Sequence, residues 1–280
     1  MTSYLHFARE MRLGRLFRHG DGRLLITPLD HSVTDGPVVP RGSTIDHLTG
    51  QLAAGGVDAV VVHKGVLRHI SPARFAGMSL IVHLSASTRH APDSDAKYLV
   101  TAVEDALRLG ADAVSVHINM GSADERQQIG DLGRVADLCD RWNLPLLAMV
   151  YPRGPGIDHP QAPELVVHAA TLAADLGADV VKAPYAGSVA EMRDVVAACP
   201  IPLLCAGGPR RGSGTDALAF VRDALLGGAA GVAMGRNIFQ AADPRRMAAR
   251  VAAVVHGEPQ PLVADKTEGQ CDERTEAVLA

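Results

Sequence analysis

The sequence is poor in aromatic residues, and this limits the kind of core it can form. Phe, Trp and Tyr together make up 4% of the 280 residues, whereas 47% of the residues are hydrophobic. The core must therefore consist mainly of Ala, Val, Leu and Ile. Such side chains suit the strands of a parallel sheet, because helices cover both faces of these strands.

No charge of one sign dominates the sequence, and no long apolar run occurs. The formal net charge is −4, and there is no long run of Lys or Arg, so the electrostatic signature of nucleic-acid binding is missing. No apolar stretch approaches the roughly 20 residues that cross a bilayer. The N-terminal stretch MTSYLHFAREMRLGRLFRHG is too polar for a secretory signal. We expect a cytoplasmic protein with neither a nucleic-acid nor a membrane partner.

Cysteine is also scarce. The four cysteines form no CxxC pair and show no spacing typical of a metal site: they are Cys139, Cys199, Cys205 and Cys271. This pattern agrees with a reduced, cytoplasmic protein.

A recurring junction is the most informative feature that is present. Residues 53–64, 108–119, 175–185 and 226–237 each combine a helix end, a Gly and a short β-branched strand. The junctions are spaced by roughly 50 to 65 residues, which leaves room for one further strand and helix between them. The four junctions therefore fall at every second strand-helix unit.

Filling the intervals gives eight strands that alternate with helical stretches such as 124–142 and 162–177. This alternation predicts an α/β protein with a (β/α)8 TIM barrel. An open doubly wound sheet is the alternative, but the usual GxGxxG after the first strand is absent. The predicted strands are 24–30, 58–64, 79–85, 112–118, 145–151, 179–183, 202–208 and 231–235.

We predict one domain, a barrel over residues 1–256 with a short N-terminal extension. Residues 257–280 are polar and form a C-terminal tail outside the repeat.

Polar residues gather where the predicted strands end, which is where barrel enzymes place their catalytic groups. Some of these side chains can be satisfied core groups, but a structural role for all of them is hard to justify. They are Asp30, His31, His63, Lys64, His83, Ser85, His117, Asn119, Tyr151, Arg153, Lys182, Tyr185, Gly207, Gly208, Gly235 and Arg236.

Lys182 ends a strand inside the apolar run ADVVKAPY. Desolvation lowers the pKa of a lysine and leaves a neutral amine that can attack a carbonyl. In the alternative, its stem packs in the barrel and its head pairs with a carboxylate. Lys64 is a rival nucleophile, or a second positive charge near the first.

Two further residues are candidates for catalysis. Tyr151 can give and take a proton during carbon–carbon cleavage, or it can simply fill the mouth of the barrel. Asp30 can bind or deprotonate a substrate hydroxyl, or pair with one of the lysines. His31 and Arg153 lie beside these positions, and we count them, together with Lys64, as substrate-binding groups.

Glycines follow the last two strands. The loops after the seventh and eighth strands of such barrels often bind phosphate. Gly207 and Gly208 would let backbone N–H groups approach the anion, as would Gly235, and Arg236 can add a charge-assisted bond. The alternative is that these are simple turn glycines. We expect a phosphorylated small-molecule substrate.

A metal site is the competing interpretation of the histidines. His63, His83 and His117 end neighbouring strands and might converge on zinc. The first strand has no HxH, however, and the eighth has no Asp or Glu. We therefore expect hydrogen-bonding histidines, no metal and no cofactor.

The motifs together resemble the archaeal-type class I aldolases of the DeoC/FbaB group, over roughly residues 10 to 256. In particular, they are similar to the 2-amino-3,7-dideoxy-D-threo-hept-6-ulosonate synthases and to the aldolases of aminohydroxybenzoate biosynthesis. The segments are LITPLDHSVTDGP, VVVHKG, HLSAST, ADAVSVHIN, LPLLAMVYPRGP, GADVVKAPYAG, CAGGPR and GVAMGRNIFQ.

The resemblance implies Schiff-base chemistry on Lys182, acid/base chemistry by Tyr151, a role for Asp30 and phosphate-binding GG and GRN loops. It also implies a homo-oligomer, often a decameric ring. One departure concerns the residues after the lysine, which are commonly Thr-Asn-Tyr in the family but Ala183-Pro184-Tyr185 here. This removes two polar groups beside the nucleophile.

We thus expect a class I aldolase or transaldolase. It would join a phosphorylated ketose donor, either dihydroxyacetone phosphate or a dideoxyketose phosphate, to aspartate semialdehyde. The alternatives are an archaeal-type fructose 1,6-bisphosphate aldolase, a thiolase-like relative and a non-catalytic phosphosugar-binding barrel.

Overall fold

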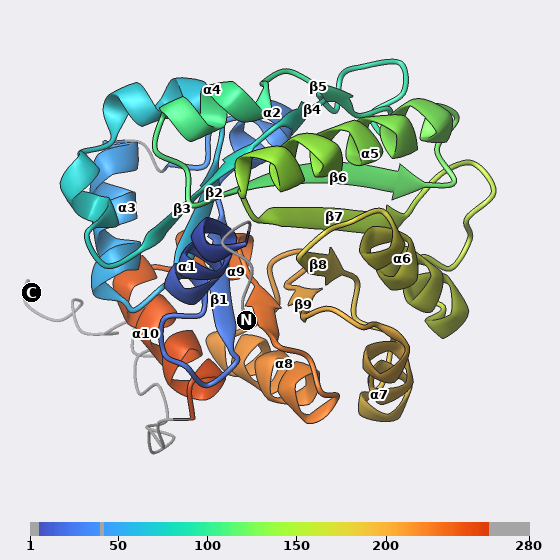
Figure 1. Ribbon diagram of the computed structural model, residues 1–280. Coiled ribbons are helices and arrows are strands. Elements are labelled where there is room, and N and C mark those ends of the chain that lie inside the picture. Colours follow the sequence, from blue (N-terminus) through green and yellow to red (C-terminus); the bar gives the residue numbers. More distant parts are fainter. Residues whose placement is uncertain (1–5, 40–41, 258–280) are drawn as a thin grey trace, which may run out of the picture.

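Eight parallel strands close into a barrel in the computed structural model, which describes residues 6–39 and 42–257. The order around the barrel is β1-β10-β9-β8-β7-β6-β3-β2 (Figure 1). Each of the eight predicted strands is present, and the (β/α)8 class is confirmed. The strands are β1 (Leu24–Pro28), β2 (Ala59–Val62), β3 (Ser79–His83), β6 (Ala113–Met120), β7 (Leu146–Pro152), β8 (Val180–Ala183), β9 (Leu203–Ala206) and β10 (Gly231–Ala233).

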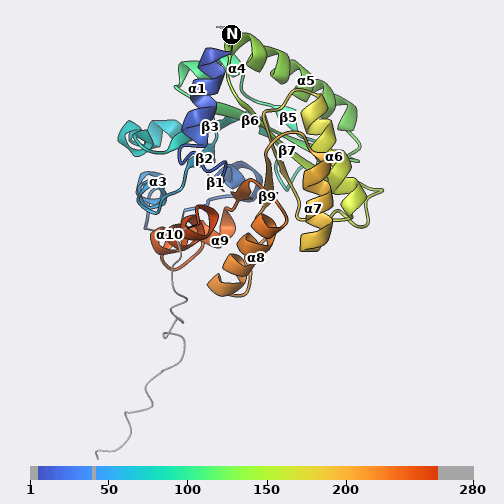
Figure 2. The same ribbon diagram turned by 60° about the horizontal axis from the view of Figure 1, so that its bottom comes forward.

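Helices form a layer around the strands (Figure 2). A small antiparallel pair, β4 (Ser85–Ala86) and β5 (Tyr98–Leu99), follows β3. The helices are α1 (Phe7–Leu16), α2 (His31–Asp35), α3 (Ile45–Ala54), α4 (Val103–Arg108), α5 (Glu125–Trp142), α6 (Pro163–Asp175), α7 (Val189–Ala198), α8 (Gly214–Leu226), α9 (Arg236–Phe239) and α10 (Pro244–Val255).

The strict alternation of strands and helices fails at one place. Between β2 and β3 the chain forms only two short 3-10 helices, η1 (Lys64–His69) and η2 (Pro72–Phe75). Pro72 has no N–H to donate, and it also disfavours a helical conformation at Ser71. A long α-helix is therefore interrupted in this connection.

Side chains of the strands alternate between two separate cores. In β1, Leu24 and Ile26 belong to the core inside the barrel, whereas Leu25 belongs to the core between barrel and helices. This follows from the two-residue period of a strand. The inner core is small and almost free of aromatic residues, because opposite strands leave little room between them. Its members on the strands are Leu24, Ile26, Ala59, Val61, Ile81, Ala113, Leu147, Met149, Val180, Leu204 and Ala233.

The N-terminal helix α1 covers the end of the barrel at which the strands begin. Leu16 is buried in the inner core, and Leu13 and Phe17 pack against it. The predicted N-terminal extension is thus part of the barrel's packing.

Three of the four repeated junctions share an aspartate, and the fourth has Ala230 at the same place. Every such carboxylate accepts a backbone N–H from the neighbouring strand and pairs with an arginine of the N-terminal segment. The N–H donors are Leu25 to Asp58 at 2.7 Å, Leu80 to Asp112 at 3.0 Å and Leu146 to Asp179 at 2.7 Å. The ion pairs are Arg18 with Asp58 at 2.9 Å, Arg15 with Asp112 at 3.1 Å and Arg9 with Asp179 at 2.8 Å.

The glycine of each junction is equally constrained. Gly56, Gly110, Gly177 and Gly228 have φ angles of +80°, +84°, +92° and +88°. Other residues rarely adopt this left-handed conformation. The repeat in the sequence is therefore a repeat of helix ends.

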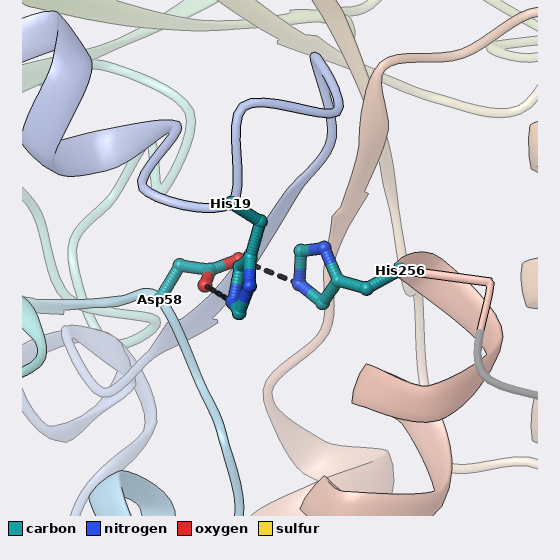
Figure 3. Close-up of side chains that lie close together, drawn as sticks. All are labelled: His19, Asp58 and His256. Atoms are coloured by element: carbon teal, nitrogen blue, oxygen red, sulfur yellow. Dashed lines mark hydrogen bonds and ion pairs between the residues drawn. The ribbon is translucent and has the colours of Figure 1, made fainter.

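Two histidines add to the network at Asp58 (Figure 3). Nε2 of His19 lies 3.2 Å and Nε2 of His256 lies 3.1 Å from its carboxylate, and Nδ1 of His256 lies 2.8 Å from Asp21. His256 directly follows α10, so this contact ties the last helix to the N-terminal segment. Burial lowers the pKa of His256, but Asp58 and Asp21 outweigh it and leave the pKa raised.

No helix in the described ranges is long and apolar enough to cross a membrane. Cys139, Cys199 and Cys205 are free thiols. The predicted tail and Cys271 lie outside the described residues, except for Gly257.

Candidate active site

Side chains point alternately into and out of the barrel along each strand. The inward positions are apolar within the barrel, but they are polar at the C-terminal ends of the strands. Two residues beyond Val61, Ile81 and Val180, the inner position is taken by a histidine, a histidine and a lysine. Tyr151 follows Met149 in the same way. The residues that reach this end are Asp30, His63, His83, His117, Tyr151 and Lys182.

Lys182 is buried, with 7% of its surface exposed. Its Nζ lies 3.8 Å from Sδ of Met149 and 5.7 Å from the ring centroid of Tyr151. Within residues 6–39 and 42–257, no carboxylate lies within the 4.0 Å of an ion pair with it. The structure thus surrounds this amine with a thioether and an aromatic face.

Asp30 comes two residues after the end of β1, close enough to Lys182 to be affected by its charge. Its side chain is 16% exposed, and its Oδ2 lies 4.0 Å from Nε2 of His83. Burial opposes the charged form, but His83, His31 and Lys182 outweigh it and hold the pKa of Asp30 below its usual range. Asp30 is therefore an anion at neutral pH.

The histidines around Asp30 are neutral at physiological pH. Burial lowers the pKa of His83 to about 4, against the attraction of Asp30, and burial also lowers the pKa of His31 and His63. Nδ1 of His83 lies 2.8 Å from Oγ of Ser115, and the rings of His63 and His83 are 5.3 Å apart. These residues are suited to orient hydroxyl groups.

The alternative zinc site has no geometric counterpart. In the described part of the chain, one group of three His, Cys, Asp or Glu residues has ligand atoms within 4.8 Å of one another, and it is His19, Asp58 and His256. That group lies at the other end of the barrel. The Asp58 carboxylate there already accepts from Arg18 and from the backbone N–H of Leu25, in addition to the two histidines.

Tyr151 is half-buried and has cations on its ring faces. The Arg153 guanidinium lies 4.7 Å from the ring centroid, and Nζ of Lys182 is 5.7 Å away. The His117 ring is 4.9 Å from it. The structure therefore brings the predicted pair Lys182 and Tyr151 together, with Arg153 at the rim.

The two glycine loops also lie together, joined by Asn237. Its Nδ2 donates to the carbonyl of Pro209 at 3.1 Å, and its Oδ1 accepts from the N–H of Arg211 at 2.8 Å. Asn237 thereby fixes the loop that starts at Gly207 and Gly208 against α9. The sequence contained Asn237 in its GRN motif, but only the fold shows its bracing role.

Gly235 and Arg236 bring these loops to Asp30 and His31. A Cβ at Gly235 would lie 2.9 Å from both the carbonyl of Pro28 and Cε1 of His31, so only glycine fits there. The Nε of Arg236 is buried and has no hydrogen-bond partner among the described residues. This guanidinium can therefore accommodate an anion.

Lys64, the rival nucleophile and an expected substrate-binding group, is not brought to this cluster. It comes one residue after the inward-facing His63, so the alternation turns it outward. Its side chain is 45% exposed, and its Nζ lies 3.9 Å from Asp105 on α4. It lines an outer groove of about 570 Å³ beside η1 and η2.

Lys97 was missed by sequence reasoning. It precedes β5 and is buried, with 6% of its surface exposed. It stands in the polar stretch RHAPDSDAKY, where nothing distinguishes it from a surface lysine.

Comparisons with known proteins agree with this geometry. A 2-amino-4,5-dihydroxy-6-oxo-7-(phosphonooxy)heptanoate synthase of Streptomyces griseus is 59% identical over 250 residues, which cover 89% of this chain and 91% of the relative. A 2-amino-3,7-dideoxy-D-threo-hept-6-ulosonate synthase of Archaeoglobus fulgidus is 44% identical over 250 residues, with the same coverage.

Solved structures give the same answer. An archaeal fructose-1,6-bisphosphate aldolase, with its catalytic lysine bound to a carbinolamine intermediate, matches with a TM-score of 0.83 and 29% identity. The match covers 89% of this chain and 100% of that one. The family model of the DeoC/LacD family aldolases matches residues 24–241. The chain is therefore an aldolase-type enzyme and belongs to the DeoC/LacD aldolase family.

Proposed function

We propose that the chain is a Schiff-base aldolase that joins dihydroxyacetone phosphate to aspartate semialdehyde. The observation that carries this is the buried amine of Lys182, which has no ion-pair partner in the described ranges and faces Tyr151. An amine held against a thioether and an aromatic ring, with no ion pair to occupy it, can attack a carbonyl carbon.

The choice of substrates follows from the chemistry of the Streptomyces relative's product. Its name describes a seven-carbon chain with a ketone at carbon 6, hydroxyls at carbons 4 and 5, and a phosphate at carbon 7. Breaking the bond between carbons 4 and 5 gives dihydroxyacetone phosphate and aspartate semialdehyde. The compound named for the Archaeoglobus relative is 7-deoxy. The higher identity to the Streptomyces enzyme thus favours the phosphorylated three-carbon donor, with a transaldolase using a dideoxyketose phosphate as the variant.

The reaction would run through Lys182. Its amine attacks the donor ketone, and loss of water gives an iminium. Removal of a proton from the adjacent hydroxyl-bearing carbon gives an enamine, whose carbon attacks the aldehyde. The aldehyde oxygen takes up a proton, and water then hydrolyses the iminium and releases Lys182. Tyr151 would carry the protons, and anionic Asp30 would orient a substrate hydroxyl.

The phosphate would lie between the two glycine loops. Backbone N–H groups at Gly207, Gly208 and Gly235 and the guanidinium of Arg236 would bind it. His31 would contribute from the same side, since it lies against Gly235.

Fructose 1,6-bisphosphate aldolase is the second candidate, favoured by the archaeal structural relatives. It would use the same donor and the same lysine. The two candidates are separated by the acceptor, aspartate semialdehyde or glyceraldehyde 3-phosphate, in an assay of carbon–carbon bond formation.

Borohydride trapping tests the shared chemistry. With dihydroxyacetone phosphate and borohydride, peptide mass spectrometry is expected to find a reduced adduct on Lys182, and none in Lys182→Met. An adduct on Lys64 would move the nucleophile to the outside of β2. The absence of any adduct in the wild type would overturn the Schiff-base mechanism.

We also propose that the chain forms a ring-like homo-oligomer. Light scattering, which measures the molar mass in solution, tests this.

A further inference from the structure

The mechanism above leaves one buried cation without a role. Nζ of Lys97 donates a hydrogen bond to Oγ of Ser87 at 2.5 Å, and Ser87 donates to the carbonyl of Ser94 at 2.7 Å. No carboxylate of the described residues lies within 4.0 Å of Lys97. An ammonium has three donors, and burying it without a counter-ion is costly. Lys97 is therefore prepared for an anion that the chain itself does not supply.

The loop that carries Lys97 is firmly anchored. Nδ2 of Asn119 and Nε2 of Gln128 both donate to the carbonyl of Asp95, at 2.9 and 3.0 Å. Oδ1 of Asn119 lies 2.9 Å from Nε2 of His117. This holds the loop over β6 and α5, so the position of Lys97 is fixed before any ligand arrives.

Lys97 acts on two histidines of the site, one of which the proposed nucleophile also affects. Burial, Lys97 and then His83 lower the pKa of His117 well below its usual value. His83 in turn is affected by both Lys182 and Lys97. Arg153 lies close enough to Lys97 to repel it. Lys97 thus belongs to the active-site mouth, near His83 and His117.

The barrel order places Lys97 opposite the proposed phosphate loops. Its loop follows β3 and lies over β6, which neighbours β3, whereas the phosphate loops follow the neighbouring strands β9 and β10. In the closed order of eight strands, these two pairs lie on opposite sides of the ring. Lys182 on β8 lies next to β9. A substrate that held its phosphate at β9 and β10 and its ketone at Lys182 would extend across the mouth toward Lys97.

We propose that Lys97, held by Ser87, binds the carboxylate at the far end of the acceptor aldehyde and so makes the enzyme selective for an anionic acceptor. This proposal rests on the proposed function. The two anionic ends of the seven-carbon product would then lie at opposite sides of the barrel mouth. In the fructose bisphosphate alternative the acceptor's anion would be a phosphate, and the test below distinguishes the two.

The test compares Lys97→Met with the wild type on two aldehydes of similar size, aspartate semialdehyde and 3-aminopropanal, which lacks the carboxylate. We expect kcat/KM to fall about 10- to 100-fold for the first, as for loss of a charge-assisted hydrogen bond, and to change little for the second. Borohydride trapping of dihydroxyacetone phosphate on Lys182 is expected to stay at the wild-type level. Lys97→Arg should restore part of the selectivity.

A control removes the same charge elsewhere. Arg222→Met on the outer face of α8 is expected to leave both reactions unchanged. Equal losses for both aldehydes in Lys97→Met would show that Lys97 only holds its loop, and would overturn the proposal. A larger loss with glyceraldehyde 3-phosphate than with aspartate semialdehyde would assign the site to a phosphorylated acceptor and overturn the carboxylate. If the wild type itself forms no adduct, the proposed function fails, and this inference fails with it.

Discussion

The two ends of the barrel use the same kinds of residue in opposite ways. At the end where the strands begin, Asp58, Asp112 and Asp179 each accept a backbone N–H and pair with an arginine. At the end where the strands finish, Oδ1 of Asp30 and Nδ1 of His31 are buried without a hydrogen-bond partner among the described residues. They are 3.8 Å apart, too far to satisfy each other.

This difference separates residues that hold the fold from residues that serve a ligand. Buried polar atoms are nearly always hydrogen-bonded in native proteins, because leaving one unsatisfied costs about 1–3 kcal/mol. At the first end Nε of Arg9 makes no hydrogen bond, but it lies 2.8 Å from the Asp179 carboxylate in an ion pair. At the second end Oδ1 of Asp30, Nδ1 of His31 and Nε of Arg236 are all buried without a hydrogen-bond partner among the described residues. We infer that the missing partners at the second end are substrate atoms, and four variants test this contrast.

Lys182→Met should have the largest effect on activity. Loss of the nucleophile is expected to lower kcat by about 10⁴-fold or more. Thermal stability should be equal to the wild type or higher, because methionine fills a similar volume without a buried charge. Steady-state kinetics and a thermal melt measure the two quantities. A variant that keeps its rate, or that unfolds, would place Lys182 with the structural residues.

Tyr151→Phe should reduce the rate but leave the imine chemistry intact. Removing the hydroxyl takes away a proton carrier, so kcat is expected to fall by about 10²- to 10⁴-fold. The adduct with dihydroxyacetone phosphate should still form on Lys182, and peptide mass spectrometry after borohydride detects it. If turnover is unaffected, Tyr151 only fills the barrel mouth.

The fold could be predicted because each part of the repeated junction depends on residues that are close in the sequence. These parts are a left-handed glycine, a strand of β-branched residues and a helix of known period. The structure of the β2–β3 connection was not predicted, because the alternation of strands and helices does not reveal that η1 and η2 replace a full α-helix there. The sequence also predicted which strand ends carry polar residues.

The sequence could not decide between the two lysines at strand ends. Lys182 and Lys64 both follow a β-branched run, and only the inward or outward direction of the side chain separates them. A one-residue error in a strand boundary reverses that direction. Lys97 and Asn237 depend on contacts between distant loops, and the network at His256 joins residues that are far apart in the chain. No local pattern encodes such contacts.

Asp58→Asn tests the first end of the barrel. The side chain is fully buried and accepts from Arg18 and two histidines, so removing its charge leaves these donors poorly paired. We expect a loss of about 3 kcal/mol in the free energy of unfolding, measured with guanidinium chloride, and an unchanged kcat for the folded enzyme.

Asp140→Asn is the matched control. Asp140 also pairs with an N-terminal arginine, Arg9, but is 71% exposed, so its loss should be below about 1 kcal/mol. Equal losses in both variants would remove the distinction between buried and exposed pairs.

His256→Gln should have the smallest effect, a change in the free energy of unfolding that depends on pH. Asp58 and Asp21 raise the pKa of His256 in the folded protein above its usual 6.5. The protonated form is therefore stabilised by folding. This contribution is fully present below about pH 6.5 and is lost as the pH rises through the folded pKa.

Glutamine keeps a polar side chain but cannot carry the charge. The wild type should therefore exceed His256→Gln by about 1 kcal/mol near pH 6, and by less near pH 9, in guanidinium chloride unfolding. His168→Gln, on the exposed face of α6, should show no such pH-dependent difference. A gap that stayed constant with pH would mean that His256 stabilises the protein by packing and neutral hydrogen bonds. The ion pairs at the first end would then involve the arginines but not His256.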